Sequence, residues 1–147
     1  MDWKSVAIEK LKDYEAKRQA LENIPLEIAQ VESNMTSIRS AGAISAPVIS
    51  SRGNGREEMY ITNIERREEL ERKLEQARHW LNIVDRGLSI LNREERLVLE
   101  RFYIYPVKYA AERLCDDLGL MDARTVYRRR EVAVRLFTIA LYGCTES

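Results

Sequence analysis

The sequence has few of the residues that catalytic, metal-binding or membrane-spanning proteins require. Its two cysteines, Cys115 and Cys144, lie far apart with no Cys-x-x-Cys pair, and with one histidine they argue against a zinc site. No nucleophile paired with a base and no phosphate-binding loop is recognisable, so we expect neither an enzyme nor a bound cofactor. No apolar run could cross a membrane and no N-terminal signal pattern is present, which predicts a cytoplasmic protein without a membrane partner.

Glycine and proline are also scarce, with six and three residues respectively. Charged residues make up 33% of the chain, and Leu, Ile, Arg, Glu and Ala dominate the stretches with a helical pattern. This composition predicts an all-α fold. Because the net charge is zero, an affinity for nucleic acid would have to come from a local concentration of charge.

The N-terminal part, residues 1–91, has the pattern of two long amphipathic helices. Apolar residues recur at helical spacing from Trp3 to Ile38 and again from Ile61 to Leu91. Pro25 interrupts the first stripe without changing its phase, so we expect a kink or a brief break there. Residues 40–56 are rich in Gly, Ser, Ala and Pro, which indicates a flexible connection. Together these features predict an antiparallel helical hairpin with coiled-coil-like arms.

A two-helix hairpin covers only one apolar seam of each helix. Its stripes also include the aromatic residues Trp3, Tyr14, Tyr60 and Trp80, which leaves apolar surface to be buried. Self-association through the N-terminal helices, giving a homo-oligomer, is the simplest way to cover it. The alternative is that the arms fold back on the C-terminal part, and the sequence does not separate the two.

A new helix is predicted to begin after Asn92. Glu95 follows Asn92 by three residues, the spacing at which each side chain satisfies a free backbone amide at a helix start. Apolar residues from Leu97 to Tyr103 form a face to be buried, and Pro106 ends the helix.

Two further helices are predicted to be joined by a tight turn. A short helix runs from about Val107 to Leu118 with Tyr109 facing inward, and Gly119 supplies the turn. Asp122 then caps a helix from Ala123 to about Leu141. The inner face of this last helix is predicted to be formed by Val126, Ala133, Phe137 and Ala140. The order of helix, glycine-containing turn and helix is that of a helix-turn-helix, here within residues 92–147.

Basic charge is concentrated on the last of these helices. Residues 121–141 hold five arginines against two acidic residues, a local balance of +3. Arginine presents a planar set of donors to phosphate oxygens and to guanine, and a helix fits the major groove. The partner predicted by this pattern is double-stranded DNA.

The position of each residue along the helix divides the expected contacts. The exposed first turns are where bases are usually read, and later basic residues are placed to bind phosphate. The predicted base contacts are Ala123, Arg124, Thr125, Tyr127 and Arg128. The predicted phosphate contacts are Arg129, Arg130 and Arg135. We expect Arg124, Arg128 and Arg129 to be exposed on one side; the alternative is that the arginines pair with acidic residues of the preceding helix, Glu94, Glu95 and Glu100.

Three segments of this region resemble region 4 of sigma-70-type factors. The segment LNREERLVLERFYI resembles its opening helix, residues 113–120 resemble its Glu-Ile-Ala-x-x-Leu-Gly-Ile motif, and residues 124–130 resemble the start of its recognition helix. With the N-terminal arms included, the chain resembles phage transcriptional regulators of the ArpU/RinA-like type. The resemblance implies a sequence-specific regulator of phage or prophage genes in a bacterial host cell, with host RNA polymerase as a further partner.

A second reading of the same pattern is a coiled-coil adaptor or structural phage protein. In that case the C-terminal helices would bind protein rather than DNA. The two hypotheses differ in salt dependence, because binding to phosphates releases counterions and weakens steeply as salt rises.

Overall fold

The computed structural model describes residues 1–44 and 50–146, and over these residues the chain is helical, as the composition predicts. Apart from one bridge between Asp2 and Glu146, the described residues form no β-structure. The elements are α1 (Trp3–Ile44), α2 (Ser50–Ser89), α3 (Arg93–Leu99), the π-helical segment η1 (Glu100–Ile104), α4 (Ala110–Leu118) and α5 (Ala123–Tyr142). The predicted all-α fold, a long hairpin followed by shorter helices, is confirmed.

The chain divides into two compact units. One consists of Met1–Arg18 together with His79–Ser147, and the other is Gln19–Arg78. The boundary expected near residue 91 falls inside the unit formed by Met1–Arg18 and His79–Ser147. The reason is that the N-terminal end of α1 and the C-terminal end of α2 pack with the C-terminal helices.

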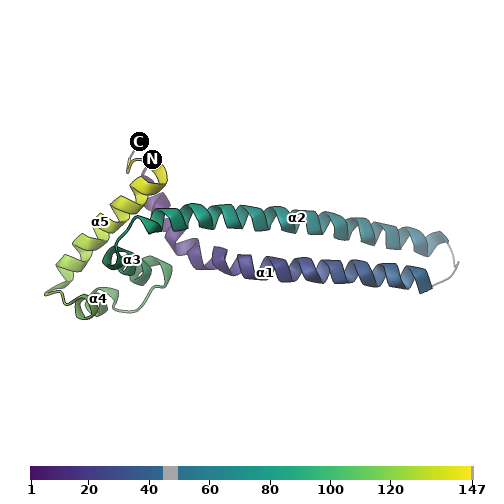
Figure 1. The fold of residues 1–147 in the computed structure, drawn as a ribbon, viewed down its shortest axis with the longest axis horizontal. Helices are drawn as coiled ribbons and strands as arrows, with labels where there is room; N and C mark the ends of the chain where they lie inside the picture. The colour runs from purple at the N-terminus through teal and green to yellow at the C-terminus, as the bar shows by residue number, and fades with distance from the viewer. Residues whose placement is uncertain (45–49, 147) are drawn as a thin grey trace. The chain divides into compact units, whose positions relative to one another are not determined.

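The unit Gln19–Arg78 consists of antiparallel lengths of α1 and α2 (Figure 1). Helix α1 is continuous through Pro25, so of the kink and the brief break expected there the break does not occur. Both helices also extend into the predicted connection, α1 as far as Ile44 and α2 from Ser50, while residues 45–49 of that prediction lie outside the described residues. Once a helix has nucleated, each added residue gains one hydrogen bond, which favours extension of such long helices into sequences of weak helix propensity.

The first core of the unit formed by Met1–Arg18 and His79–Ser147 joins α1, α2 and α5 with Leu99 of α3 and Ile104 of η1. Ala7, Leu11, Val84 and Phe137 are fully buried in it. Gly87 lets α2 approach α5 closely, since a Cβ atom there would lie 2.9 Å from Leu141 Cδ2. Within this unit the ends of the arms therefore do fold back on the C-terminal part, the alternative that the sequence left open.

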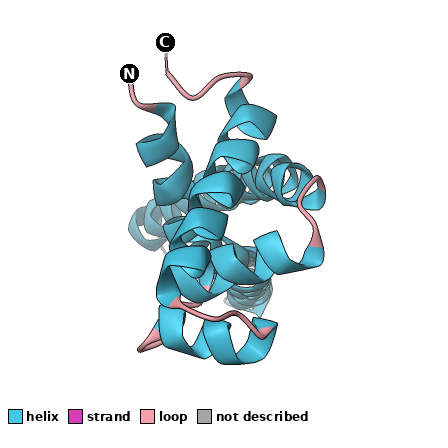
Figure 2. Cartoon of the chain, turned by 90° about the vertical axis from the view of Figure 1, so that its left-hand side faces the viewer, coloured by secondary structure: helices cyan, strands magenta, loops and turns pink. Residues whose placement is uncertain are grey.

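The two chain ends belong to this same unit and lie near each other (Figure 2). The rings of Trp3 and Tyr142 are 4.7 Å apart between centroids, and the Trp3 amide donates to the carbonyl of Thr145 at 3.0 Å. These contacts fix the start of α1 against the end of α5.

A second core joins α3, α4 and the first half of α5. Its buried members are Val98, Ala111, Leu114 and Val126. Helix α5 therefore contributes to two cores, with Val126 in this one and Phe137 in the first. Leu99 of α3 lies in the first core as well, next to Val98 of the second, so α3 and α5 together link the helix-turn-helix to the rest of its unit.

Two predicted inward positions are wrong. Tyr109 is 64% exposed, because α4 begins at Ala110 and Tyr109 precedes it in a left-handed conformation with φ of 59°. Ala140 is exposed, whereas Val134 and Thr138 are buried on α5. The Thr138 hydroxyl donates to the Val134 carbonyl at 2.6 Å, which satisfies its polar group inside the core.

Candidate nucleic-acid interface

The turn between α4 and α5 is closed by backbone and side-chain hydrogen bonds. Gly119 ends α4 with φ of 67°, and the Leu120 amide donates to the Cys115 carbonyl at 2.9 Å. Asp122 caps α5, accepting hydrogen bonds from the Thr125 amide at 3.1 Å and from its hydroxyl at 3.2 Å. The start of α5 is thus fixed in position relative to α4.

The predicted base-contact residues divide into exposed and half-buried groups. Arg124, Tyr127 and Arg128 are exposed on the first turns of α5. Ala123 is half-buried and packs against the second core, while the Thr125 hydroxyl bonds Asp122. The structure therefore brings together three side chains that are free to meet a partner and two that stabilise the start of the helix.

Arg129 is engaged within the protein. Its guanidinium forms an ion pair with Glu94 of α3, and its side chain is 38% exposed. This differs from the expectation that Arg129 is exposed beside Arg124 and Arg128. It matches the alternative that an arginine of α5 pairs with an acidic residue of the helix that begins after Asn92, here α3. The reason is that Arg129 lies on the side of α5 that faces the start of α3.

Arg130 packs on two aromatic rings. Its guanidinium carbon lies 4.8 Å from the centroid of Phe102 and 4.9 Å from that of Tyr127. Phe102 and Tyr127 are in turn 6.1 Å apart with their planes inclined at 46°. Phe102 belongs to η1. Its apolar character in the sequence did not predict a contact with Arg130.

Arg135 is exposed on the same face of α5 as Arg124 and Arg128. Helical geometry puts Arg124 and Arg135 roughly 16 Å apart along the axis. Glu131, also exposed, lies on this face between Arg128 and Arg135, so the face carries three positive charges and one negative charge. Guanidinium groups can donate hydrogen bonds to phosphate oxygens or to base edges, and Arg124 and Arg128 lie in the first turns of α5.

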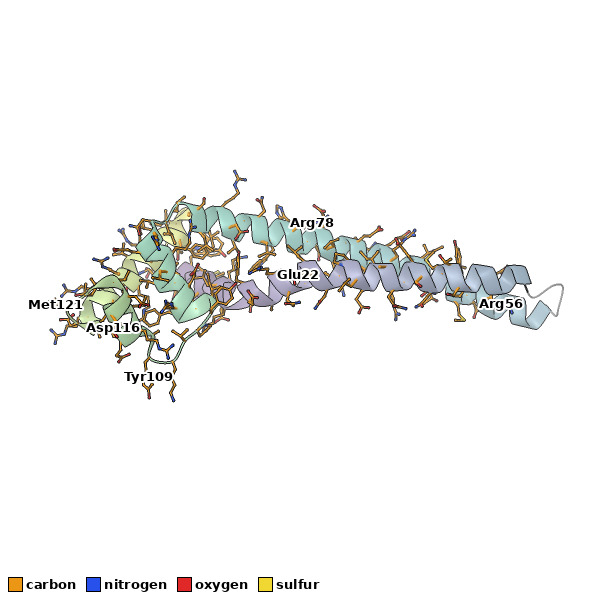
Figure 3. The ribbon with its side chains drawn as sticks, turned by 60° about the horizontal axis from the view of Figure 1, so that its bottom comes forward. Glu22, Arg56, Arg78, Tyr109, Asp116 and Met121 are labelled. Atoms are coloured by element: carbon orange, nitrogen blue, oxygen red, sulfur yellow. The ribbon has the colours of Figure 1, made fainter. Side chains whose placement is uncertain are left out.

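Met121 is a further candidate that the sequence did not single out. It lies in the turn directly before α5 and is 99% exposed, pointing away from the protein (Figure 3). Its position next to the Asp122 cap places an apolar side chain beside the predicted base-reading residues. A turn residue of this type carries no periodic signal, which is why sequence patterning passed over it.

A shallow groove of about 430 Å³ runs between the start of α3 and the middle of α5. It is lined by Asn92, Glu94, Glu95, Thr125, Arg128, Arg129, Val132 and Leu136. Val132 is 44% exposed, so the groove combines apolar and charged side chains next to the exposed arginines.

Comparisons of the chain with protein-family models, curated proteins and solved structures give no significant match. Within residues 1–44 and 50–146, no group of three or more His, Cys, Asp or Glu side chains is arranged to hold a metal ion. None of the helices in the described ranges is long and apolar enough to span a membrane.

Proposed function

We propose that this protein is a sequence-specific DNA-binding transcriptional regulator that reads the major groove with α5. The observation that carries the proposal is the capped start of α5, which follows a glycine-containing turn and presents Arg124, Tyr127 and Arg128 to solvent. A helix of this kind fits the major groove with its first turns against the base edges.

The contacts of the arginines support a division of roles. On this proposal Arg124 and Arg128 bind base edges, and Arg135, exposed farther along the same face, binds phosphate. We expected Arg129 and Arg130 to bind phosphate. Instead, both make contacts with side chains of the protein itself. We assign them to holding α5 against α3 and η1.

The resemblance to sigma region 4 and to ArpU/RinA-like regulators supports a narrower proposal. The protein would control phage or prophage genes in the cytoplasm of a bacterial host, with RNA polymerase as a second partner. The capped start of α3 and the turn at Gly119 support this proposal.

We propose further that the unit Gln19–Arg78 joins two copies of the chain. Leu26, Met59 and Ile61 are each more than half exposed on its helices, and apolar side chains of this size favour burial against a second apolar surface. Two-fold symmetry is common among DNA-binding proteins because it matches paired half-sites.

An adaptor that docks onto protein is the second candidate. The groove between α3 and α5 favours it, because Val132 and Leu136 offer apolar surface beside the charged rim. In this case an apolar helix of another protein would cover the groove, and binding would depend little on salt.

Salt dependence separates the two functions. Binding of the full chain to a pool of random-sequence duplexes is measured at several salt concentrations. DNA binding predicts that the logarithm of affinity falls linearly with that of salt, by about 0.9 for each phosphate contact. The absence of any salt-sensitive binding would contradict the DNA-binding proposal and favour the adaptor.

A further inference from the structure

The ring of Tyr127 is held by Phe102 on one side and by Arg130 on another. The Phe102 to Tyr127 separation of 6.1 Å and the Arg130 separations of 4.8 and 4.9 Å lie within the ranges of attractive ring and cation–π contacts. Even so, Tyr127 remains 43% exposed. Part of an exposed aromatic side chain is thus fixed in place before any partner binds.

Phe102 transmits this order from the protein interior. It packs against the second core, whose members Val98, Leu114 and Val126 are fully buried. Side chains in such cores keep well-defined positions because they are closely packed. The position of the Tyr127 ring is therefore set by the core through Phe102, and not by the flexibility of a surface side chain.

The location of Tyr127 on α5 determines what its exposed part can meet. It lies one residue before Arg128 and three after Arg124, both exposed and both assigned above to base edges. When α5 lies in the major groove, the Tyr127 ring faces the bases together with them. The apolar group available there is the C5 methyl of thymine, which no other DNA base carries.

We propose that Tyr127 reads a thymine methyl group in the major groove, and that Phe102 and Arg130 are positioning residues that hold its ring for this contact. The inference rests on the proposed DNA-binding function. Fixing the ring in advance lowers the entropy lost on binding, so that more of the energy of the methyl contact appears as affinity.

The inference gives Arg130 a role different from that of the exposed arginines. Its guanidinium lies against two rings, so its loss should disturb recognition at the base pair that Tyr127 reads. Loss of Arg135, which is exposed on the same helix, removes the same charge without touching Tyr127. The pair Arg130→Gln and Arg135→Gln is therefore a matched comparison.

The probe is a duplex that the wild-type protein selects from a pool of random-sequence duplexes. Each thymine is replaced in turn by uracil, which removes only the C5 methyl. We expect the wild type to lose about fourfold in affinity at one thymine, the equivalent of about 0.8 kcal/mol for one methylene-sized apolar group. Tyr127→Ala should show no loss at that thymine, whereas Tyr127→Phe should keep it because the ring remains.

The positioning role is tested on the same duplexes. Arg130→Gln should reduce the effect of uracil at that thymine to less than twofold, about half of the wild-type effect on a logarithmic scale. Arg135→Gln should weaken binding to all duplexes and leave the effect of uracil unchanged. Thermal unfolding of each variant shows whether the fold is retained, and a fold-wide loss would lower every affinity alike without removing the effect at one position.

The outcomes separate this inference from the proposed function. If the wild type selects no duplex, the proposed function fails and the inference fails with it. If the wild type selects a duplex and Tyr127→Ala keeps the effect of uracil at every thymine, DNA binding stands and the methyl contact is overturned. A contact of the Tyr127 hydroxyl with phosphate would instead appear as an equal loss of affinity for all duplexes in Tyr127→Phe. If Arg130→Gln and Arg135→Gln behave alike, the positioning role is overturned.

Discussion

Arg129 of α5 forms an ion pair with Glu94 of α3. Glu94 lies in the first turn of α3, directly before Glu95. The side chains of Glu95 and Asn92 together cap the helix. The pair therefore joins the fixed start of one helix to the helix that carries the exposed arginines. It also neutralises one of the five arginines of α5, so the positive charge available to a partner is smaller than the sequence suggests.

Removal of the Glu94 charge should strengthen DNA binding. Glu94→Gln frees Arg129 and takes one negative charge from the edge of the interface, so we expect a gain of about twofold to tenfold at low salt that shrinks as salt rises. Affinity for random-sequence duplexes measures it. Glu75→Gln is the matched control, since Glu75 pairs with Arg78 in the other unit. Equal effects of the two substitutions would show that only the total charge matters.

The approach of α2 to α5 requires glycine at position 87. In Gly87→Ala the new Cβ would lie 2.9 Å from Leu141 and 3.0 Å from the ring of Phe137, which is fully buried. We expect a loss of about 1–2 kcal/mol in the free energy of unfolding, since overpacking outweighs the gain in helix propensity. Urea unfolding followed by the fluorescence of Trp3 and Trp80, both in the unit concerned, measures the loss.

Gly55→Ala is the control for this prediction, because a Cβ there meets no atom within 4 Å. It should not destabilise the protein, and it should add about 0.5–1 kcal/mol of helix stability in its own unit. If the midpoint of urea unfolding, followed by fluorescence, is the same in Gly87→Ala as in the wild type, the close packing of α2 on α5 is contradicted.

The contact between Tyr14 and Asp85 makes stability depend on pH. Burial, and then the 2.6 Å hydrogen bond that the Tyr14 hydroxyl donates to the Asp85 carboxylate, raise the pKa of Tyr14 from 10.0 to about 12. Because the folded state holds this proton more tightly, the stabilisation is complete below pH 10 and is lost as pH rises from 10 to about 12.

Tyr14→Phe removes that contribution. The difference in the free energy of unfolding between wild type and variant should be about 1–2 kcal/mol below pH 10 and should vanish above the raised pKa. Tyr109→Phe, at a residue that is 64% exposed, is the control and should stay close to the wild type. A wild-type advantage over Tyr14→Phe that is constant across this pH range would contradict the assignment.

Self-association is predicted to depend on the apolar residues of the unit Gln19–Arg78. Leu26→Glu combined with Ile61→Glu should convert a dimer into a monomer, because the new charges would lose water on association. Sedimentation at several protein concentrations measures the change. Ser33→Glu, at an exposed polar position of α1, the helix that holds Leu26, should leave the mass of the assembly unchanged. A wild type that stays monomeric at all concentrations would rule out this interface.

Local signals in the sequence were sufficient to predict the starts of α3 and α5 and the turn between α4 and α5. Asn92 with Glu95, Gly119 and Asp122 each act through the backbone within a few residues, and all are confirmed. Capping and turn chemistry depends on neighbours along the chain, so one sequence contains it completely.

Contacts between elements were harder to predict. The sequence gives the charge of Arg129 and Arg130 and left Glu94 as one of three acidic candidates, but the pairing with Glu94 and the contact with Phe102 follow from how α3, η1 and α5 cross. Helix α4 also begins later than predicted, at Ala110, since Tyr109 has a left-handed backbone, which is rare for residues other than glycine. These features depend on tertiary geometry, which periodicity does not describe.

The most direct measurement is the affinity of Arg124→Ala/Arg128→Ala for the duplex selected by the wild type. The control is Arg66→Ala/Arg78→Ala, which removes two exposed arginines of the other unit and so changes the net charge equally. Each lost base contact costs about 1–3 kcal/mol, so we expect the first variant to lose its preference for the selected duplex and the control to keep it. Equal affinities for the selected duplex in the two variants and the wild type would contradict DNA recognition by α5.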